Sequence, residues 1–325
     1  MKRKFRSVSM AAGAVMAIAC STLLAGPASA ADRFVTVGGG GTGGTYYIVA
    51  AAIANLLEKN MPSVKATARI STGTLENTRL VGRGNAEFGL AGSSGPWAAA
   101  IGEDPFQKER YNNIRYVMTG YSSTFQMMVP AESPIKTVAD FKGKRIGIVS
   151  GTTVTTWLPN VAEAYGVKGA YQGFALNPTE LVDSLRDGNI DALVFAGAAP
   201  NPGMSDLAAS KPMRFLSLDT EKAKAIEKLM PYWVPATMKK TMYPNMPQDV
   251  LALDAPNILM THDKVPEDIV YGLVKAMVEN QDALKAIHPL AAEFNLENVG
   301  RAMVVPPHPG AARYFKEKGI NLPAS

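Results

Sequence analysis

The feature that most constrains the fold is a repeated unit in which a β-rich run ends in Gly, Ser and Thr and leads directly into a helical pattern. Four such units are clear. The predicted strands are 34–37, 64–70, 87–91 and 144–149, and the predicted helices are 46–59, 75–80, one whose first residue is Pro96, and 154–165. Strands that alternate with helices in this way are typical of parallel sheets covered by helices. The pattern therefore predicts an α/β fold.

A second pattern, at a longer distance along the chain, indicates two related lobes. The sequence Gly-Asn-Ala-Glu at 84–87 matches Gly-Asn-Ile-Asp at 188–191, and each match follows an apolar helical stretch and precedes an apolar strand. The chain, with 325 residues, also exceeds the size at which one hydrophobic core keeps growing. We therefore expect two domains of ordinary size.

We expect one lobe to be built from two separate segments of the chain and the other from a single segment. We predict lobe 1 from 31–123 together with 249–325, and lobe 2 from 124–248. The first crossing should fall near 116–128, where 115–118 and 125–129 look like two extended segments joined by a polar stretch. The return crossing is expected in the Pro-rich stretch 232–248, before an apolar strand at 250–260. Later helices are predicted from Pro266 to about 287 and over 311–318.

The first 30 residues have the three-part build of a secretory signal. Basic residues at 2–6 precede an uncharged, mostly apolar run at 10–24, and Ala28-Ser29-Ala30 supplies the small residues of a cleavage site. The run is too short and too interrupted for a membrane helix. Cleavage after Ala30 and export to the periplasm are therefore predicted. A lipoprotein site at Cys20 is the weaker alternative.

This leader also decides how charge and cysteine content are interpreted. The whole chain carries +5, but the leader holds four basic residues and no acidic ones, so the mature chain is nearly neutral. Binding to nucleic acid or to membrane lipid is therefore not indicated. The one cysteine, Cys20, lies in the leader, which excludes disulfides, thiolate catalysis and cysteine-based metal sites from the mature chain.

The loops of the four units are suited to binding an anion. In open α/β sheets ligands bind beyond the carboxyl ends of the strands, and helix N-termini there present unpaired N–H groups. One helix end contributes about 0.3 to 2 kcal/mol, whereas micromolar binding needs about 8 kcal/mol. Several loops must therefore close on one solute. Ordinary helix capping by the Ser and Thr side chains is the alternative interpretation.

The tryptophans and histidines give weaker signals. Trp97 follows one of the loops and is a candidate wall of the site, whereas Trp157 and Trp233 are expected in the core. The three histidines are scattered and far from the loops, so a structural role is expected. No arginine occupies the four loops, and thus no bidentate carboxylate clamp is predicted.

The sequence argues against two classes of enzyme. Glycines at 39, 41 and 44 fit the spacing of a dinucleotide fingerprint, but the second strand ends without the acidic residue that would bind the ribose. Motifs of hydrolases and of zinc sites are absent from the sequence. No enzyme activity, cofactor or metal is therefore predicted. An exported ligand-sensing domain of the same fold remains open.

Three segments carry a resemblance to a known family. They are Gly-Thr-Gly-Gly-Thr-Tyr-Tyr at 41–47, Ser-Thr-Gly-Thr-Leu-Glu-Asn at 71–77 and Val-Ala-Asp-Phe-Lys-Gly-Lys-Arg at 138–145. Together with 308–314, they are similar to the motifs of TAXI-type solute receptors of TRAP transporters. The resemblance implies a type II periplasmic-binding-protein fold with a ligand cleft between two hinged lobes. It also implies delivery of an organic acid or amino acid, such as glutamate, to a sodium-driven permease. The protein is expected to be a monomer.

The resemblance also implies where the ligand binds. Candidate positions are the loop and first-turn residues Thr42, Gly43, Gly44, Thr45, Tyr46, Ser71, Thr72, Thr74, Asn77, Ser93, Ser94, Trp97, Thr152, Thr153, Ala198 and Asn201. Two departures from the family pattern fall among them. Gly73-Thr74 replaces a pair of glycines, and Ser94 stands where an acidic residue is more usual. The identity of the ligand therefore stays open.

Overall fold

A computed structural model describes residue 1 and residues 32–42, 45–150 and 156–323 of the chain. The chain divides into two compact units, Met1–Asp32 and Arg33–Ser325, and the fold concerns the second. The predicted signal sequence lies outside the described residues. Within the described ranges, no helix has the length and hydropathy needed to cross a membrane.

The first three predicted units are confirmed and build one half of the sheet. They comprise β1 (Arg33–Gly38), α1 (Thr45–Asn60), β2 (Val64–Arg69), α2 (Thr74–Gly82), β3 (Phe88–Gly92) and α3 (Ser94–Ile101). Strand β1 pairs in parallel with β2 and β3, so the loops that follow the three strands gather at one edge. Helix α1 packs on this sheet with its Val49, Ile53 and Leu57 side chains buried. These three residues follow one another at intervals of four, which places their side chains on one face of the helix.

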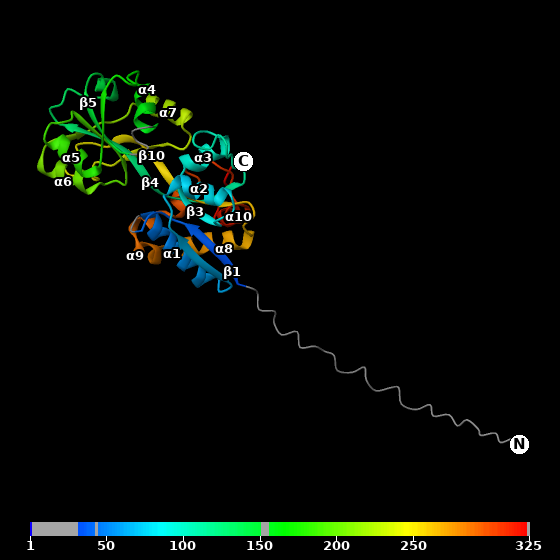
Figure 1. The fold of residues 1–325 in the computed structure, drawn as a ribbon. Helices are drawn as coiled ribbons and strands as arrows, with labels where there is room; N and C mark the ends of the chain where they lie inside the picture. Colours follow the sequence, from blue (N-terminus) through cyan, green and yellow to red (C-terminus); the bar gives the residue numbers. More distant parts are fainter. Residues whose placement is uncertain (2–31, 43–44, 151–155, 324–325) are drawn as a thin grey trace. The chain divides into compact units, whose positions relative to one another are not determined.

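Two long antiparallel strands run through both halves of the molecule (Figure 1). They are β4 (Ile114–Pro130) and β10 (Val250–His262). The second part of β10 pairs with β3, its first part pairs with β9 (Val234–Met238), and the end of β4 pairs with β7 (Ala192–Gly197). The prediction of two separate extended segments at the first crossing is wrong, because β4 is continuous. Its residues are buried almost throughout, which keeps the polar stretch in the strand.

The other half repeats the same architecture. It contains β5 (Arg145–Val149), α4 (Leu158–Ala164), β6 (Gln172–Leu176), α5 (Pro178–Arg186), β7, α6 (Pro202–Ser210), β8 (Met213–Phe215), α7 (Thr220–Leu229) and β9. The strand order is β2-β1-β3-β10 in one half and β6-β5-β7-β4 in the other. In each half, the second strand in sequence lies at the edge of the sheet, and the first and third strands follow it in space. A long strand that the other half shares comes next. This arrangement is the predicted type II periplasmic-binding-protein fold with two α/β lobes.

The short sequence match occupies equivalent places in the two lobes. Gly84 and Gly188 both adopt positive φ, at 71° and 75°, directly after α2 and α5, a conformation that favours glycine. Glu87 accepts the backbone N–H of Thr36 in β1 at 2.6 Å, and Asp191 accepts that of Arg145 in β5 at 2.8 Å. The match therefore marks two structurally related units.

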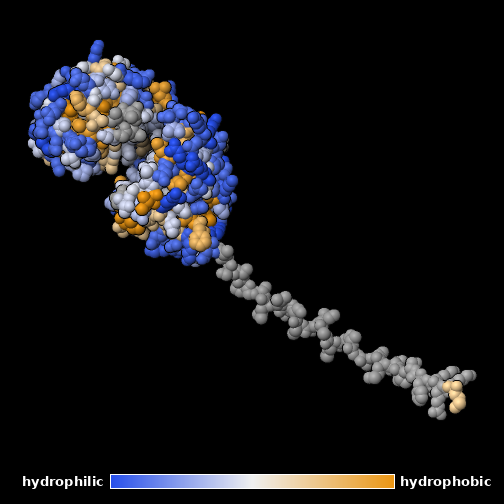
Figure 2. Space-filling view, viewed as in Figure 1, coloured by the Kyte–Doolittle hydropathy of each residue, from blue (hydrophilic) through white to orange (hydrophobic). Residues whose placement is uncertain are grey.

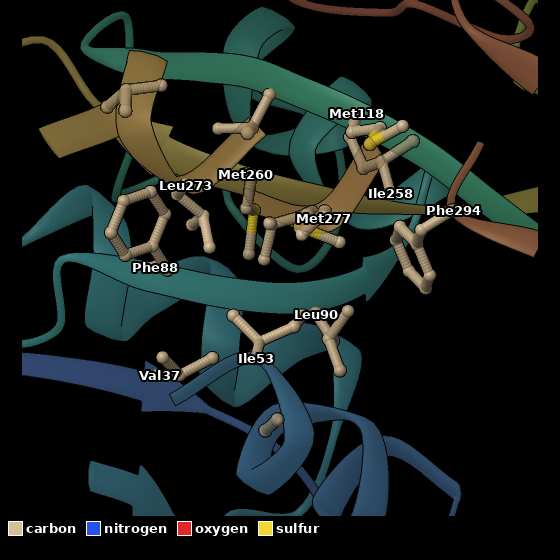
Figure 3. Packing of buried hydrophobic residues seen from close by; sticks show 14 of the residues in the cluster. Val37, Ile53, Phe88, Leu90, Met118, Ile258, Met260, Leu273, Met277 and Phe294 are labelled. Carbon is tan, nitrogen blue, oxygen red and sulfur yellow. The ribbon is translucent and has the colours of Figure 1, made fainter. Parts of the chain in front are cut away.

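The hydrophobic core changes where the long strands cross. One cluster fills the first lobe, where Ile53 on α1 faces Val37 and Leu90 on the sheet (Figure 3). In β4, Tyr121 belongs to this cluster, whereas Phe125 belongs to a second one. In β10, Ala255 belongs to the second cluster and Ile258 to the first. The predicted boundaries at 123/124 and 248/249 remain a proposal for how the chain divides into domains.

The C-terminal part of the chain returns to the first lobe. One helix predicted in this part differs from the structure. It forms α8 (Glu267–Glu279), α9 (Gln281–Ile287), short 3₁₀ turns at Pro289–Glu293 and Leu296–Asn298, and α10 (Pro309–Glu317). The single helix predicted from Pro266 to about 287 is wrong. Asn280 leaves helical geometry at φ −123°, and its side-chain amide bonds the Ala276 carbonyl, so the helix is interrupted.

The start of α3 also differs from the prediction. The helix begins at Ser94, and Pro96 is its third residue rather than its first. Proline is tolerated there because the N–H groups of the first turn have no acceptor within the helix.

Candidate ligand-binding cleft

The loops after β1 and β2 are tied together by the side chain of Ser71. Its hydroxyl donates to the Gly39 carbonyl at 2.9 Å and accepts the Gly73 N–H at 3.0 Å. Backbone bonds from Gly39 to the Arg69 carbonyl and from Ser71 to the Gly40 carbonyl reinforce the contact. Ser71 is buried and thus holds two predicted ligand loops at the same strand edge.

Tyr46 joins four elements at that edge. Its hydroxyl bonds the side-chain oxygen of Asn257 in β10 and lies 3.4 Å from the Thr74 hydroxyl in α2. The Thr74 hydroxyl in turn accepts the Gly92 N–H at the end of β3, at 3.0 Å. Burial raises the pKa of the Tyr46 hydroxyl to about 12, so it remains a neutral hydrogen-bond donor. No local sequence pattern indicated Asn257 as a partner of Tyr46.

Asn77 is engaged by the backbone rather than open to solvent. Its fully buried amide group donates to the Leu90 carbonyl at 2.7 Å and to the Gly39 carbonyl. These bonds join α2 to both β1 and β3. Thr72 similarly bonds within its own turn, to the carboxylate of Glu76 at 2.8 and 2.9 Å. Local bonding at the start of α2 thus occupies the Thr72 side chain, whereas contacts between α2 and the sheet hold the Asn77 side chain.

A cleft of about 610 Å³ lies between the two lobes. On one side it is lined by the first turns of α2 and α3 and the loop that follows α3, and on the other by α4, the end of α7 and the segment after it. The lining residues are Leu75, Ser94, Gly95, Trp97, Ala98, Glu103, Asp104, Pro105, Thr156, Trp157, Asn160, Glu163, Leu229, Met230 and Tyr232. Two of the predicted site residues, Ser94 and Trp97, are among them.

The two lobes touch at the edge of this cleft. The buried Ser93 hydroxyl donates to the Tyr232 carbonyl at 3.1 Å. The Trp97 ring, from α3, lies against the Tyr232 ring with a centroid distance of 5.1 Å. Trp97 packs on the hydrophobic cores of both lobes. The loop after β3 is therefore the point where the predicted site meets the second lobe.

The described cleft carries negative rather than positive charge. Glu103, Asp104 and Glu163 line it, and no Lys or Arg stands among the described lining residues. Arg79 and Arg83, which lie near the loops in sequence, instead pair with Glu109 on the surface. An anion in this cleft would thus have to be held by backbone N–H groups and neutral side chains.

The remaining predicted residues lie in three situations. Thr42 and Ala198 are exposed, and Thr45 opens α1 in a half-buried position. Asn201 caps α6 and lines a separate depression of about 200 Å³ with α5. Gly43, Gly44, Thr152 and Thr153 lie outside the described residues.

Sequence reasoning missed most of the second lobe's contribution. Trp157 was expected in the core, and it does pack on Trp233 at 4.9 Å, yet it also lines the cleft. Met230 and Tyr232 follow α7 in a stretch that predicted only a crossing between lobes. Their one signal was an apolar and aromatic cluster before the crossing. Across the described ranges, no group of three or more His, Cys, Asp or Glu side chains is arranged to hold a metal ion.

Two α/β lobes that share two long strands, with a cleft lined from both, define a two-lobed binding protein. Much of the visible surface of both lobes is hydrophilic, with smaller apolar patches (Figure 2). The chain belongs to the NMT1-like family, whose model matches residues 37–319.

Individual proteins of known name show similarity over most of the same region. Binding protein BAB2_1146 of Brucella abortus (strain 2308), itself only provisionally named, is 25% identical over 227 residues, 64% of this chain and 67% of that protein. The structure of XAC2383 from Xanthomonas citri bound to ATP superposes with a TM-score of 0.53 at 8% identity, covering 87% of this chain and 94% of the other. The periplasmic aliphatic sulphonate binding protein SsuA from Escherichia coli gives a TM-score of 0.47 at 18% identity, covering 88% and 79%. These relatives and neighbours are named as binding proteins or ligand complexes, not as enzymes.

Proposed function

We propose that this protein is the extracytoplasmic solute receptor of a TRAP-type transporter of the TAXI class. In this role it captures a small carboxylate-bearing solute and delivers it to membrane permease subunits without chemical change. The observation that carries the proposal is the cleft between the two lobes, with the first turns of α2 and α3 at its edge. The motifs at 41–47, 71–77 and 138–145 support the TAXI assignment within the NMT1-like family.

A carboxylate suits the ends of these helices. The first-turn N–H groups of Ser94 and Gly95 have no acceptor within α3, and helix N-termini favour negative charge. Hydrogen bonds to a charged ligand contribute about 1.5 to 3 kcal/mol each, so three or four of them reach the roughly 8 kcal/mol of micromolar binding. Enclosure between lobes raises each contribution by removing competing water.

The proposed site combines cleft residues with the predicted loops. Ser94 and Trp97 stand in the cleft, and Thr45 stands at the start of the longest neighbouring helix. Ser71, Asn77 and Ser93 hold these loops in place, so their role in binding would be indirect. The leader at 1–30 supports export to the periplasm, where we expect the mature chain to act as a monomer.

A thermal-shift screen of the purified mature protein tests the proposal. The panel holds monocarboxylates, dicarboxylates, oxoacids and amino acids including glutamate, with nicotinamide dinucleotides as the control. A ligand present at 100 times its Kd stabilises the folded state by about 2.7 kcal/mol, which is easily detected. A shift with a carboxylate, followed by loss of its uptake when the gene is deleted, would support the proposal. A shift with the dinucleotides alone would refute it.

A further inference from the structure

Aromatic and apolar side chains form one end of the cleft. Trp97 comes from α3, while Trp157 stands before α4 and Tyr232 follows α7, so both lobes contribute. Met230 and Leu229 extend the apolar wall on one side and Leu75 extends it on the other. Leu75 is 43% exposed and Leu229 is 63% exposed, although both are large apolar side chains. The cleft therefore leaves apolar surface in water that a ligand could cover.

The size of the cleft exceeds what a short aliphatic acid would fill. Its volume of about 610 Å³ falls within the range of about 300 to 1,000 Å³ that is usual for sites binding larger organic molecules. Aromatic side chains make favourable edge or offset contacts with another ring at centroid distances of about 4.5 to 7 Å. Trp97 and Tyr232 already adopt such a geometry with each other, at 5.1 Å.

The acidic residues of the cleft restrict which charged groups a ligand can carry. Glu163 is paired with Lys168 at 2.7 Å, which leaves Glu103 and Asp104 to set the local field. Glu103 lies close enough to Tyr232 to contribute, after burial, to raising the pKa of its hydroxyl to about 12. A second carboxylate placed here would meet like charge with no Lys or Arg among the described lining residues to compensate.

We propose that the solute is a monocarboxylate with an aromatic ring, whose ring packs against the wall of the cleft formed by Trp97, Trp157 and Tyr232. This inference rests on the proposed function and specifies the ligand class of the same site. The carboxylate lies at the first-turn N–H groups of Ser94 and Gly95 in α3, and the ring lies against the aromatic side chains of the cleft. Aliphatic dicarboxylates, including glutamate, are disfavoured because their second carboxylate would approach Glu103 and Asp104.

Isothermal titration of the mature protein tests the ligand class. The probes are benzoate and phenylacetate, compared with succinate, glutamate and betaine. We expect an aryl monocarboxylate to bind at least about 10-fold more tightly than any dicarboxylate, given the usual strength of aromatic contacts and of charge repulsion. Tighter binding of a dicarboxylate would overturn this inference and leave the proposed function standing. Betaine carries a quaternary ammonium group beside its carboxylate, so binding of betaine alone would show that the negative rim favours a cationic group. That result would also overturn this inference and leave the proposed function standing. If no carboxylate of any class binds, the proposed function itself fails.

Two sets of variants test the geometry. Trp97→Leu keeps an apolar side chain but removes the ring face, and should weaken binding of the aryl ligand about 5- to 10-fold. Phe174→Leu, a comparable change at a 42% exposed position on β6, is its control and should leave the affinity unchanged.

The second set addresses charge. Glu103→Gln combined with Asp104→Asn should narrow the preference for the aryl ligand by raising the affinity for succinate about 3- to 10-fold. Glu132→Gln, at an exposed position outside the cleft, is the matched control. Equal affinities in Trp97→Leu and the unsubstituted protein, or no gain for succinate in the double variant, would overturn the inference. Circular dichroism of each variant confirms that the comparison is made on folded protein.

Discussion

The hydroxyl of Ser93, in the first lobe, donates a hydrogen bond to the backbone carbonyl of Tyr232, in the second, at 3.1 Å. The bond is buried and crosses the edge of the cleft. It joins the predicted ligand loop after β3 directly to the opposite lobe. The lobe arrangement seen here therefore depends partly on a neutral hydrogen bond whose strength a single substitution can measure.

Ser93→Ala should weaken solute binding about 3- to 10-fold. A buried neutral hydrogen bond contributes about 0.5 to 1.5 kcal/mol, and its loss leaves the Tyr232 carbonyl without that donor. Titration with the carboxylate that gives the largest thermal shift measures the change. Ser210→Ala is the control, because its hydroxyl bonds only carbonyls of its own helix. Equal losses in both variants would rule out a specific role for the contact between lobes.

Thr45→Val should lower solute affinity while the melting temperature changes little. Valine keeps nearly the same volume as threonine but lacks the hydroxyl, and Thr45 is only half-buried at the start of α1. The expected loss is about 5-fold, measured by titration. Thr220→Val, at the first position of α7, provides a comparable change at a helix start that belongs to none of the predicted ligand loops. Unchanged affinity in Thr45→Val would remove this residue from the site.

Arg301→Ala should destabilise the crossing between lobes. Asp254 in β10 accepts the Thr124 hydroxyl at 2.7 Å and pairs with Arg301 at 3.0 Å, and its side chain is only 12% exposed. Removing the guanidinium leaves a mostly buried carboxylate without its cation, which should cost about 2 kcal/mol, less than for a fully buried pair. Urea unfolding measures the free energy. In the Asp254→Asn background the same substitution should cost much less, because the charge is gone.

The pair between Arg313 and Glu267 provides the matched control. Both side chains are about half-exposed, at 49% and 47%, and solvent-exposed pairs of this kind contribute less than about 1 kcal/mol. Arg313→Ala should therefore cost clearly less than Arg301→Ala. Similar costs at the two positions would mean that the burial of Asp254 does not strengthen its ion pair.

Folding stability should decrease as the pH falls below about 6.5. Burial lowers the pKa of His308 from its ordinary value of 6.5, and its neutral ring accepts the Gly310 N–H at 3.2 Å while the other nitrogen lies 3.0 Å from the Val265 carbonyl. Glu267, Arg115 and His262 are the charged or titratable groups that act on it. The unfolded chain therefore binds the proton more tightly than the folded one, so stability is complete above pH 6.5 and is lost as the pH falls.

Urea unfolding between pH 7.5 and 5.5 measures this dependence. His308→Asn keeps a side chain that can cap α10 and should flatten the curve over this interval, although burial lowers the pKa of His262 as well, so some slope should remain. A curve of unchanged slope in His308→Asn would assign the pH dependence to other groups.

The sequence alone determined the fold class, because it depends on local patterns. The alternation of β-rich runs, glycine-rich loops and apolar helical faces needs only neighbouring residues, as the burial of Val49, Ile53 and Leu57 on α1 illustrates. The equivalent residues Gly84 and Gly188 indicated the relation between the lobes for the same reason, because each marks a local backbone conformation. Such signals are readable without knowing which segments meet.

The tertiary structure alone decided how the site is composed. Tyr46 meets Asn257, and Ser93 meets Tyr232, across 211 and 139 residues of sequence. No local pattern specifies such contacts, since they depend on how β4 and β10 cross between the lobes. The same crossing brings Glu103 and Asp104 beside Trp157 and Tyr232, and so gives the cleft an aromatic wall and a negative rim. Hydrophobic periodicity determines which face of an element is buried, whereas the packing of distant elements determines which side chains share a cavity.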